Sequence, residues 1–334
     1  MSEDNHTYFQ IMNKATALRL AQECLSPDIE KVSVRSIARL WSGMGNIYEV
    51  NATGGSGHVM IVKYIEPRLG NKKDLGDQRK FDSYAVEAAF FETYASDFLQ
   101  HHSIRIPKPL KVEREGTKTI ICMSRLENAT MDDVADGVIQ WLANFHAATW
   151  HKDYPALQPI GSYWHLDTRQ DEYNSMPTHG WEGRLKRAAR AIDAYLKRDS
   201  LQCLIHGDVK DANVMSSNGQ VAMCDFQYCG RGSPTMDVAY FFVSSVTPQE
   251  EERLVDLYFE SLCEKLSPEQ RPTRKQFDNN LGLAYCDYAR FMSGWGFWGF
   301  DIKDRVMQIL NRLDGGKILS TEKAYHEALR REFG

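Results

Sequence analysis

The first third of the chain contains five short runs in which apolar and polar residues alternate: 34–41, 47–52, 58–65, 110–114 and 118–123. Because successive side chains of a strand point to opposite faces, this period of two predicts strands of a half-buried sheet. Glycine-containing turns at 42–46, 51–57 and 115–117 separate neighbouring runs,. The pattern therefore predicts an antiparallel sheet near the amino terminus.

Apolar residues recur at helical spacing in four other stretches, which predicts helices at 15–24, 81–99, 130–150 and 181–197,. Thr130 is expected to cap the third of these helices, with Asp133 in its first turn. Two stretches, 66–80 and 151–180, show no regular pattern and are predicted to be irregular,.

The carboxyl-terminal part of the chain is predicted to be mainly helical. Capping boxes with proline at the first helical position are expected at 247–250 and at 267–270,. An aromatic-rich helix is expected around 285–298.

A short segment in the second half of the chain combines a hairpin with several polar residues. Asn218-Gly219 predicts a type I′ turn, because both central residues of that turn need a positive φ. Asn213 lies just before the first expected strand and Asp225 just after the second,. The hairpin is expected to bring these two side chains to the same end, where an amide oxygen and a carboxylate can bind Mg²⁺.

The spacing of polar residues in this segment matches a known pattern. Asp208 lies five residues before Asn213, and Asp225-Phe226-Gln227 follows the hairpin. Protein kinases have a catalytic Asp and a metal-binding Asn at this spacing, followed by Asp-Phe-Gly. With Gly207 for Arg and Gln227 for Gly, the stretch resembles the kinase-like small-molecule phosphotransferases, namely aminoglycoside phosphotransferases, choline kinases and ecdysteroid-kinase-like proteins.

This resemblance implies a role for each polar residue of the segment. Asp208 would accept the proton of a substrate hydroxyl, and Lys210 would stabilise the charge on the transferring group. Asn213 and Asp225 would hold Mg²⁺. His146 and Asp237 are expected to anchor this loop by hydrogen bonds, and a catalytic role is the alternative for each.

The resemblance also implies an ATP site in the amino-terminal sheet. Lys63 on the third strand would bind the α and β phosphates, and an acidic residue on the next helix would fix its ammonium group. Glu87 is preferred for that role because Phe90-Phe91 follows it, and Glu92 is the alternative. The glycine loop would approach the phosphates through Gly43, Gly45 and Asn46. An ordinary hairpin and a solvated lysine are the other interpretations of these features.

Residues after the fifth strand resemble the linker between the lobes of the family, where adenine bonds to the backbone. The linker residues are Met123, Ser124 and Leu126. The domain boundary is placed near 127, with a nucleotide-binding N-lobe at 1–127 and a C-lobe at 128–334 that carries the catalytic loop, metal site and acceptor pocket. The expected fold class is α+β. It is a two-lobed protein-kinase-like fold with an antiparallel-sheet N-lobe containing one helix and a mainly helical C-lobe.

The aromatic-rich stretch supplies candidates for the acceptor pocket. The run from Trp295 to Trp298 is similar to a Trp-Gly-Leu-Trp run in choline kinases, and aromatic faces attract quaternary ammonium groups. Asp287 and Arg290 lie on the same expected helix. A plain core helix is the alternative, and choline-like amines, aminosugars, sterols and other alcohols all remain open as acceptors.

Composition narrows the class of protein further. The chain has 334 residues, 43% of them apolar and 25% charged, and a net charge of −5, which argues against a nucleic-acid partner,. Its seven cysteines are dispersed and show no CxxC pair, which favours a reducing compartment,. No signal peptide and no membrane-spanning run is evident, so a cytoplasmic protein is expected.

Together these features predict an ATP- and Mg²⁺-dependent kinase that phosphorylates a hydroxyl of a small molecule. Two alternatives remain at this stage. One is a catalytically silent nucleotide-binding scaffold of the same fold, and the other is a protein kinase. The short segment between Asp225 and Asp237 argues against the protein kinase, because a polypeptide substrate docks on a longer loop there,. The sequence does not predict the oligomeric state.

Overall fold

The computed structural model describes residues 12–53, 58–66, 75–102, 104–128 and 134–334. The chain divides into two compact units, Met1–Glu127 and Asn128–Gly334. Thr130 and Asp133, which were expected to begin a helix, lie outside the described residues, as do most of the 51–57 turn and of the 66–80 loop. Among the described helices, none combines the length and apolar character needed to cross a bilayer.

The first unit is built on a five-stranded antiparallel sheet with the strand order β1-β2-β3-β5-β4. Its strands are β1 (Lys31–Arg39), β2 (Gly45–Thr53), β3 (Val59–Ile65), β4 (Pro109–Glu115) and β5 (Lys118–Ser124). Its helices are α1 (Lys14–Cys24), α2 (Leu75–Thr93), α3 (Ala95–His101) and the 3₁₀ helix η1 (Trp41–Gly43). The two-residue strand β6 (Glu127–Asn128) lies where the two units divide.

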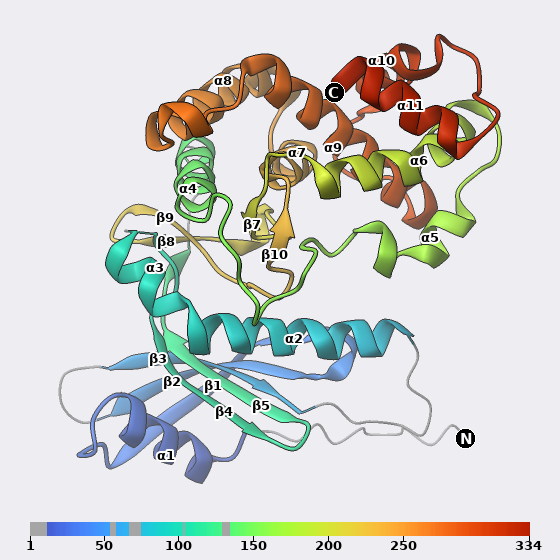
Figure 1. Ribbon diagram of the computed structural model, residues 1–334. Coiled ribbons are helices and arrows are strands. Elements are labelled where there is room, and N and C mark those ends of the chain that lie inside the picture. Colours follow the sequence, from blue (N-terminus) through green and yellow to red (C-terminus); the bar gives the residue numbers. More distant parts are fainter. Residues whose placement is uncertain (1–11, 54–57, 67–74, 103, 129–133) are drawn as a thin grey trace, which may run out of the picture. The chain divides into compact units, whose positions relative to one another are not determined.

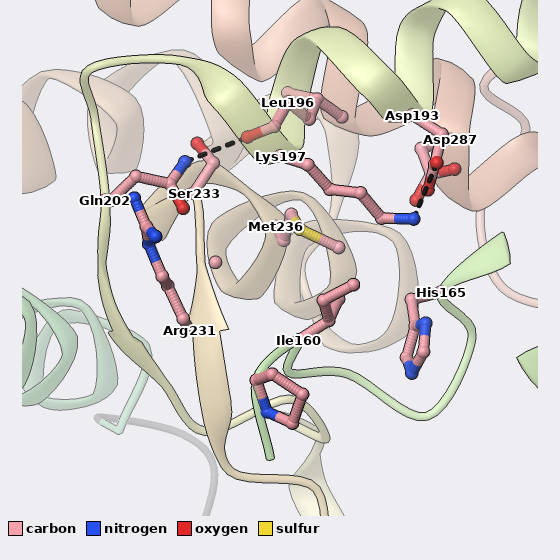
Figure 2. A pocket seen from close by; sticks show the side chains of 12 residues that line it. Ile160, His165, Asp193, Leu196, Lys197, Gln202, Arg231, Ser233, Met236 and Asp287 are labelled. Atoms are coloured by element: carbon pink, nitrogen blue, oxygen red, sulfur yellow. Dashed lines mark hydrogen bonds and ion pairs between the residues drawn. The ribbon is translucent and has the colours of Figure 1, made fainter. Parts of the chain in front are cut away.

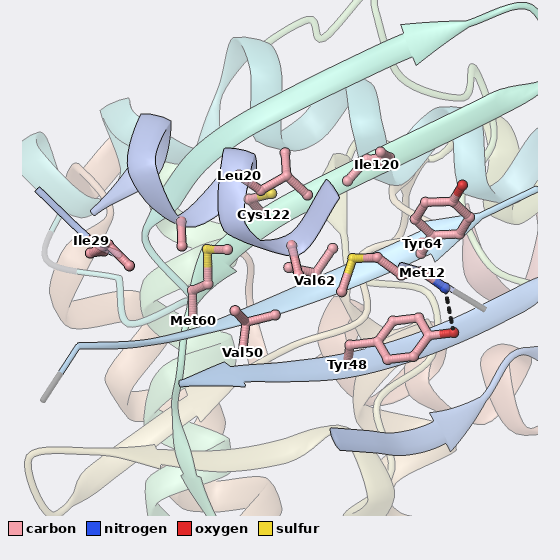
Figure 3. Packing of buried hydrophobic residues seen from close by; sticks show 12 residues of the cluster. Met12, Leu20, Ile29, Tyr48, Val50, Met60, Val62, Tyr64, Ile120 and Cys122 are labelled. Atoms are coloured by element: carbon pink, nitrogen blue, oxygen red, sulfur yellow. Dashed lines mark hydrogen bonds between the residues drawn. The ribbon is translucent and has the colours of Figure 1, made fainter. Parts of the chain in front are cut away.

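Side chains alternate between the two faces along each strand, and a different helix packs on each face of the sheet. Residues of β2, β3 and β5 that point to one face form a core with Ala17, Leu20 and Ala21 of α1. Figure 3 shows Leu20 among the side chains of these strands. Val62 and Tyr64 belong to that core, so Lys63 between them points to the opposite face, on which α2 packs against β4 and β5,. The predicted sheet is confirmed, and α1 covers the face that α2 leaves open.

The helix predicted at 81–99 is two helices. The helical backbone is interrupted at Tyr94, where φ is −120°. Phe98 of α3 stacks on Phe90 of α2 across the break, with ring centroids 5.7 Å apart. The apolar spacing therefore continues through the break and hides it in the sequence.

The second unit is mainly helical, as predicted (Figure 1). Its helices are α4 (Ala135–Ala148), α5 (Gln170–Ser175), α6 (Gly180–Arg198), α7 (Pro234–Ser245), α8 (Pro248–Lys265), α9 (Arg274–Trp295), α10 (Lys303–Asp314) and α11 (Glu322–Phe333). Its described 3₁₀ helices are η3 (Leu166–Thr168), η4 (Asp211–Asn213) and η5 (Pro268–Gln270). Its described short strands are β7 (Cys203–Ile205), β8 (Val214–Ser217), β9 (Gln220–Met223) and β10 (Gly230–Gly232).

Helix α9 is the centre of this unit, because α5, α6, α7 and α10 all pack against it. The stretch 151–180, predicted to be irregular, contains η3 and α5. Five consecutive residues of α9 near its middle, Ala284 to Tyr288, are all buried, which requires neighbours on several sides,.

Two capping predictions were wrong in detail. Pro248 begins α8 as expected, but the Thr247 hydroxyl donates to the Glu250 side chain rather than accepting from a backbone amide. The second site, 267–270, forms only η5, because residue 271 before Pro272 is extended and ends the turn,. The capping box lies instead at Thr273, whose hydroxyl accepts from the Gln276 amide at the start of α9.

The hairpin of β8 and β9 has the predicted turn. Asn218 and Gly219 have φ of 52° and 71°, and the two strands pair in register from Val214–Met223 to Ser217–Gln220. Apart from its two chain neighbours, no described residue has an atom within 4 Å of a Cβ placed on Gly219. The positive φ is therefore the only reason that this position favours glycine.

We expect Gly219→Ala to lower the free energy of unfolding by about 1 kcal/mol, the cost of a side chain at positive φ. Gly219→Asn is the matched control and should lose clearly less, because Asn tolerates the left-handed region. Urea denaturation followed by circular dichroism measures both. Equal stability of the alanine variant and the parent would show that the turn does not hold this conformation.

Candidate functional site

A buried carboxylate anchors the loop that precedes the hairpin. Asp237, in the first turn of α7, accepts hydrogen bonds from the backbone N–H groups of His206 at 2.7 Å and Gly207 at 2.8 Å. The His146 ring lies 3.1 Å from the same carboxylate and 2.7 Å from the Tyr258 hydroxyl on its other side. His146 and Asp237 are both fully buried, so they act on this loop from within the core.

Gly207 has to be glycine for two reasons. Its φ is 80°, and a Cβ would lie 2.4 Å from the Tyr228 carbonyl oxygen and 2.7 Å from the Ser162 amide nitrogen. The loop therefore runs close against two other backbone segments. This contact fixes the direction in which the next residue, Asp208, leaves the loop.

Asp208 is nearly buried and is held by residues of its own loop. The Lys210 ammonium lies 2.9 and 3.1 Å from its two carboxylate oxygens. The Asn213 amide nitrogen donates to the Asp208 carbonyl at 2.8 Å and to its carboxylate at 3.1 Å. The structure thus brings Asp208, Lys210 and Asn213 into direct contact.

Asn213 and Asp225 stand at the open end of the hairpin. The Cys224 amide donates to the Asn213 carbonyl at 3.1 Å, which places residue 213 opposite residue 224 and next to residue 225. Asp225 has a φ of 68°, and the Gln227 side chain donates to its carboxylate. Because the Asn213 amide nitrogen is directed at Asp208, its amide oxygen is turned away from that residue.

Within the described residues, no cluster of three or more His, Cys, Asp or Glu side chains has the arrangement of a metal site. A pair formed by one amide and one carboxylate is a smaller set of ligands. It is the kind that holds Mg²⁺ together with substrate phosphates and water.

In the first unit, Lys63 and Glu87 form a buried ion pair with 2.5 Å between Nζ and Oε2. Their side chains are 4% and 2% exposed. The alternative residue, Glu92, pairs instead with Arg114 at the surface, at 2.6 Å. A charged pair this deeply buried requires both partners, because removing one leaves an uncompensated charge.

The glycine loop is shorter than expected, since η1 occupies Trp41–Gly43 and β2 already begins at Gly45. A Cβ on Gly45 would lie 2.0 Å from the Tyr64 carbonyl oxygen, so strand packing alone requires glycine there. Asn46 is buried and lies opposite Tyr64 in the β2–β3 ladder. Gly43 has a φ of 65° and is exposed.

The three predicted linker residues lie at the end of β5 and just after it. Met123 is buried, and Leu126 is half-buried. The Ser124 amide donates to the Lys108 carbonyl at 2.9 Å, and its hydroxyl accepts from the Lys108 amide at 2.8 Å. Ser124 therefore ties the end of β5 to the residue that precedes β4.

The four candidate acceptor residues do not gather at one place. Asp287 and Arg290 form a pair inside the unit, with 2.9 Å between Nη2 and Oδ1, and Arg290 also donates to the Trp164 carbonyl at 2.6 Å. Trp295 and Trp298 are 63% and 40% exposed at the end of α9 and just beyond it.

A group of tyrosines near Asp208 was not identified from the sequence. The rings of Tyr163, Tyr240 and Tyr288 lie close together, with centroids 5.1 Å apart for the last two and 5.5 Å for the first two. Tyr163 donates its backbone N–H to the Gly207 carbonyl at 3.3 Å. Burial, with the nearby negative charge of Asp208 adding to it, raises the pKa of Tyr163 to about 12. In the sequence, Tyr163 lies in the stretch 151–180, which was predicted only to be irregular, and Tyr288 lies in the aromatic-rich stretch 285–298.

Some buried polar atoms around these tyrosines have no hydrogen-bond partner in the described part of the chain: Ser162 Oγ, Trp164 Nε1 and Tyr288 Oη. Buried polar groups are normally paired, so these atoms mark a place where water or a ligand would be bound. They lie beside the loop that carries Asp208.

A cavity of about 220 Å³ lies elsewhere in the second unit (Figure 2). The cavity is lined by Asp193 and Lys197 of α6, by His165 and Asp287, and by residues at the Gln202 end of β7. Asp208 follows the other end of that strand and does not line the cavity. Asp287 therefore faces a different space from the one beside Asp208.

Burial shifts the pKa of two residues that line the cavity, Asp193 and His165. Burial, with the charge of Asp287 adding to it, raises the pKa of Asp193 from 3.8 to about 6. Burial lowers the pKa of His165 from 6.5 to about 4, and its buried Nδ1 has no partner in the described residues. Lys197 offsets the charge of Asp193 at 2.7 Å.

The chain is similar to a known protein family in sequence and to solved structures in fold. The model of a family described as "phosphotransferase enzyme family" matches residues 36–275. A comparison with curated proteins found no match.

Solved structures share the fold at low sequence identity. A choline kinase from Cryptosporidium parvum Iowa II is 11% identical, covers 96% of each chain and has a TM-score of 0.57. A choline/ethanolamine kinase family protein from Mesorhizobium loti is 12% identical, covers 96% of this chain and 93% of its own, and has a TM-score of 0.53. An amicoumacin kinase in complex with AMP-PNP, Ca²⁺ and its ligand is 14% identical, covers 94% and 97%, and also has a TM-score of 0.53. These similarities confirm the predicted fold class.

Buried His165 is expected to make the free energy of unfolding depend on pH,. The unfolded chain takes up a proton at His165 near pH 6.5, whereas the folded chain does so only near pH 4, so stability falls as the pH drops through this window,. Asp193 acts in the opposite direction between pH 6 and 4, because its folded pKa is raised,. We expect His165→Gln to lose less stability than the parent between pH 7 and 5, by on the order of 2 kcal/mol.

Urea denaturation at the two pH values measures this difference. Asp193→Asn is the matched control and should lose more stability than the parent over the same range, because the opposing contribution is gone. Parallel pH profiles for His165→Gln and the parent would contradict the prediction.

Proposed function

The chain belongs to the phosphotransferase enzyme family, and we propose that it transfers the γ-phosphoryl group of ATP to a hydroxyl of a small molecule with Asp208 as the base. The family match covers more than two thirds of the chain, so the protein is a small-molecule kinase with an alcohol group as acceptor, and its family uses ATP.

The observation that carries the proposal is the contact of Asp208 with Lys210 and Asn213 on a loop anchored by Asp237. The ammonium and the amide hold the carboxylate in position, and an ionised carboxylate is the form that accepts a proton,. An alcohol oxygen hydrogen-bonded to this carboxylate would lose its proton to Asp208 as it attacks phosphorus. Lys210 is 36% exposed and can move from Asp208 toward the charge that develops on the phosphoryl group,.

The donor set at the end of the hairpin fits Mg²⁺. The Asn213 amide oxygen is turned away from Asp208, and the Asp225 carboxylate follows one residue after the 213–224 contact. Both are the hard oxygen ligands that Mg²⁺ prefers. Bound there, the ion would neutralise charge on the nucleotide phosphates. In the first unit, Lys63 would bind the α and β phosphates, and Glu87 would fix the position of its ammonium group,.

The short segment between Asp225 and α7 favours a small molecule over a polypeptide as the phosphoryl acceptor. Strand β10 of this segment pairs with β7 from Gly230–Ile205 to Gly232–Cys203. Three residues of the segment 226–233, Gly230–Gly232, thus belong to the sheet. This leaves no loop of the kind on which a polypeptide substrate would dock.

We expect Asp208→Ala to lower turnover by on the order of 10²–10⁴ while leaving affinity for ATP nearly unchanged, because the carboxylate acts on the acceptor and not on the nucleotide. The measurement is magnesium-dependent ADP release in the presence of a pool of small alcohols. Asp211→Ala, an exposed acid of the same loop, is the control and should keep normal turnover. An unchanged rate for Asp208→Ala would remove this residue from the mechanism.

Asp225→Ala should abolish the magnesium-dependent part of nucleotide binding, because it removes the charged oxygen ligand of the proposed pair. Calorimetric titration of ATP with and without Mg²⁺ separates this part from binding of the nucleotide alone. Normal affinity for Mg-ATP in this variant would exclude Asp225 as a ligand.

A further inference from the structure

Three aromatic side chains in the second unit form an aromatic box, which we define as Tyr163, Phe291 and Trp295. Phe291 and Trp295 stack on α9 with centroids 5.7 Å apart, and the Tyr163 ring lies 5.3 Å from that of Phe291 at an interplanar angle of 89°. This arrangement offers three π faces around one space. Boxes of this kind bind quaternary ammonium groups in other proteins.

The aromatic box already contains a cation of the chain itself. The guanidinium carbon of Arg169 lies 5.8 Å from the Tyr163 ring centroid, 5.4 Å from that of Phe291 and 5.8 Å from that of Trp295. All three distances are within the range of cation–π attraction. A single side chain therefore occupies the space that all three rings share.

Arg169 is fixed in this position by directional contacts. Its Nε donates to the Tyr163 carbonyl at 2.7 Å, and its Nη1 lies 3.2 Å from the Glu172 carboxylate. The side chain is only 15% exposed. A Cβ on Gly294 would lie 1.8 Å from the Glu172 carbonyl oxygen, so α5 and α9 are in backbone contact next to the aromatic box. Arg169 is thus held in the box and cannot swing out without breaking both contacts.

The aromatic box adjoins the loop that carries Asp208. Tyr163 donates its backbone N–H to the Gly207 carbonyl, one residue before Asp208. The charges of Asp208 and Arg169 both act on the Tyr163 hydroxyl. An acceptor whose hydroxyl reaches Asp208 would therefore place its neighbouring group near Tyr163 and the box.

We propose that Arg169 determines acceptor specificity: its guanidinium fills the aromatic box, so the enzyme rejects alcohols that carry a quaternary ammonium group. This inference rests on the proposed function, because it concerns the acceptor of that reaction. The fixed positive charge also repels any other cation at this position. The acceptor class that remains is neutral or anionic alcohols.

The test measures binding of a probe that contains only the quaternary ammonium group, tetramethylammonium chloride. Arg169→Ala opens the aromatic box and leaves the Glu172 carboxylate beside it. We expect about ten-fold tighter binding of tetramethylammonium to this variant than to the parent by isothermal titration calorimetry. Sodium chloride at the same concentration controls for ionic strength.

Three control variants separate an open box from other effects. Arg169→Met removes the charge but keeps the space filled, and should gain no binding. Arg169→Ala combined with Trp295→Ala should lose the gain, because one wall of the box is missing. Arg190→Ala removes an exposed arginine 5.1 Å from the Tyr173 ring, and should bind tetramethylammonium no better than the parent.

Removal of Arg169 leaves Glu172 without its partner and could prevent folding. Circular dichroism and the melting temperature report this, and Arg169→Ala with Glu172→Gln restores neutrality and should still gain binding. Tight binding of tetramethylammonium by the parent overturns the proposal. So does a folded Arg169→Ala variant with no gain.

This binding experiment is independent of phosphoryl transfer. The same gain is expected when Asp208→Ala is added to Arg169→Ala, because the aromatic box does not need the base. Failure of the proposed function would leave this gain in place, and failure of the specificity proposal would leave the effect of Asp208→Ala on turnover in place.

Discussion

The loop that carries Asp208 depends on one buried carboxylate. Asp237 accepts the backbone amides of His206 and Gly207, and the ring of His146 supports it from α4. Without this acceptor, two buried amides would lose their partner, and each such loss costs about 1–3 kcal/mol. The position of Asp208 follows from this anchor, because Gly207 presses the loop against two backbone segments and leaves one direction for the next residue.

Local chemistry explains what could be predicted from the sequence. The Asn218-Gly219 turn, the five strands of the sheet and the mainly helical second unit all follow from patterns within a few residues, and all are confirmed. The fold class and the family could be predicted because the spacing of Asp208, Asn213 and Asp225 is itself a local pattern. Glu92 has the same chemistry as Glu87, and the Phe90-Phe91 run after Glu87 was the sequence feature that favoured Glu87 as the partner of Lys63.

Contacts between distant parts of the chain explain what could not be predicted. The break at Tyr94 is hidden because Phe98 continues the apolar spacing of α2. Trp295 and Trp298 were expected to bind the acceptor together with Asp287 and Arg290, but the latter two form an internal pair. The location of Arg169 in the aromatic box depends on two segments that are distant in the sequence, 163–175 and α9, and their proximity has no local signal.

The anchor of the reactive loop and the walls of the aromatic box come from separate parts of the second unit. The anchor uses α4, α7 and α8, through His146, Asp237 and Tyr258, whereas the box uses α5 with its preceding loop and the end of α9. Arg169 and Trp295 are in none of the hydrogen bonds that hold the Asp237 anchor, and the two groups meet through Tyr163, whose N–H donates to the Gly207 carbonyl. A substitution at Arg169 or Trp295 can therefore alter the aromatic box while the hydrogen bonds that Asp237 accepts stay in place.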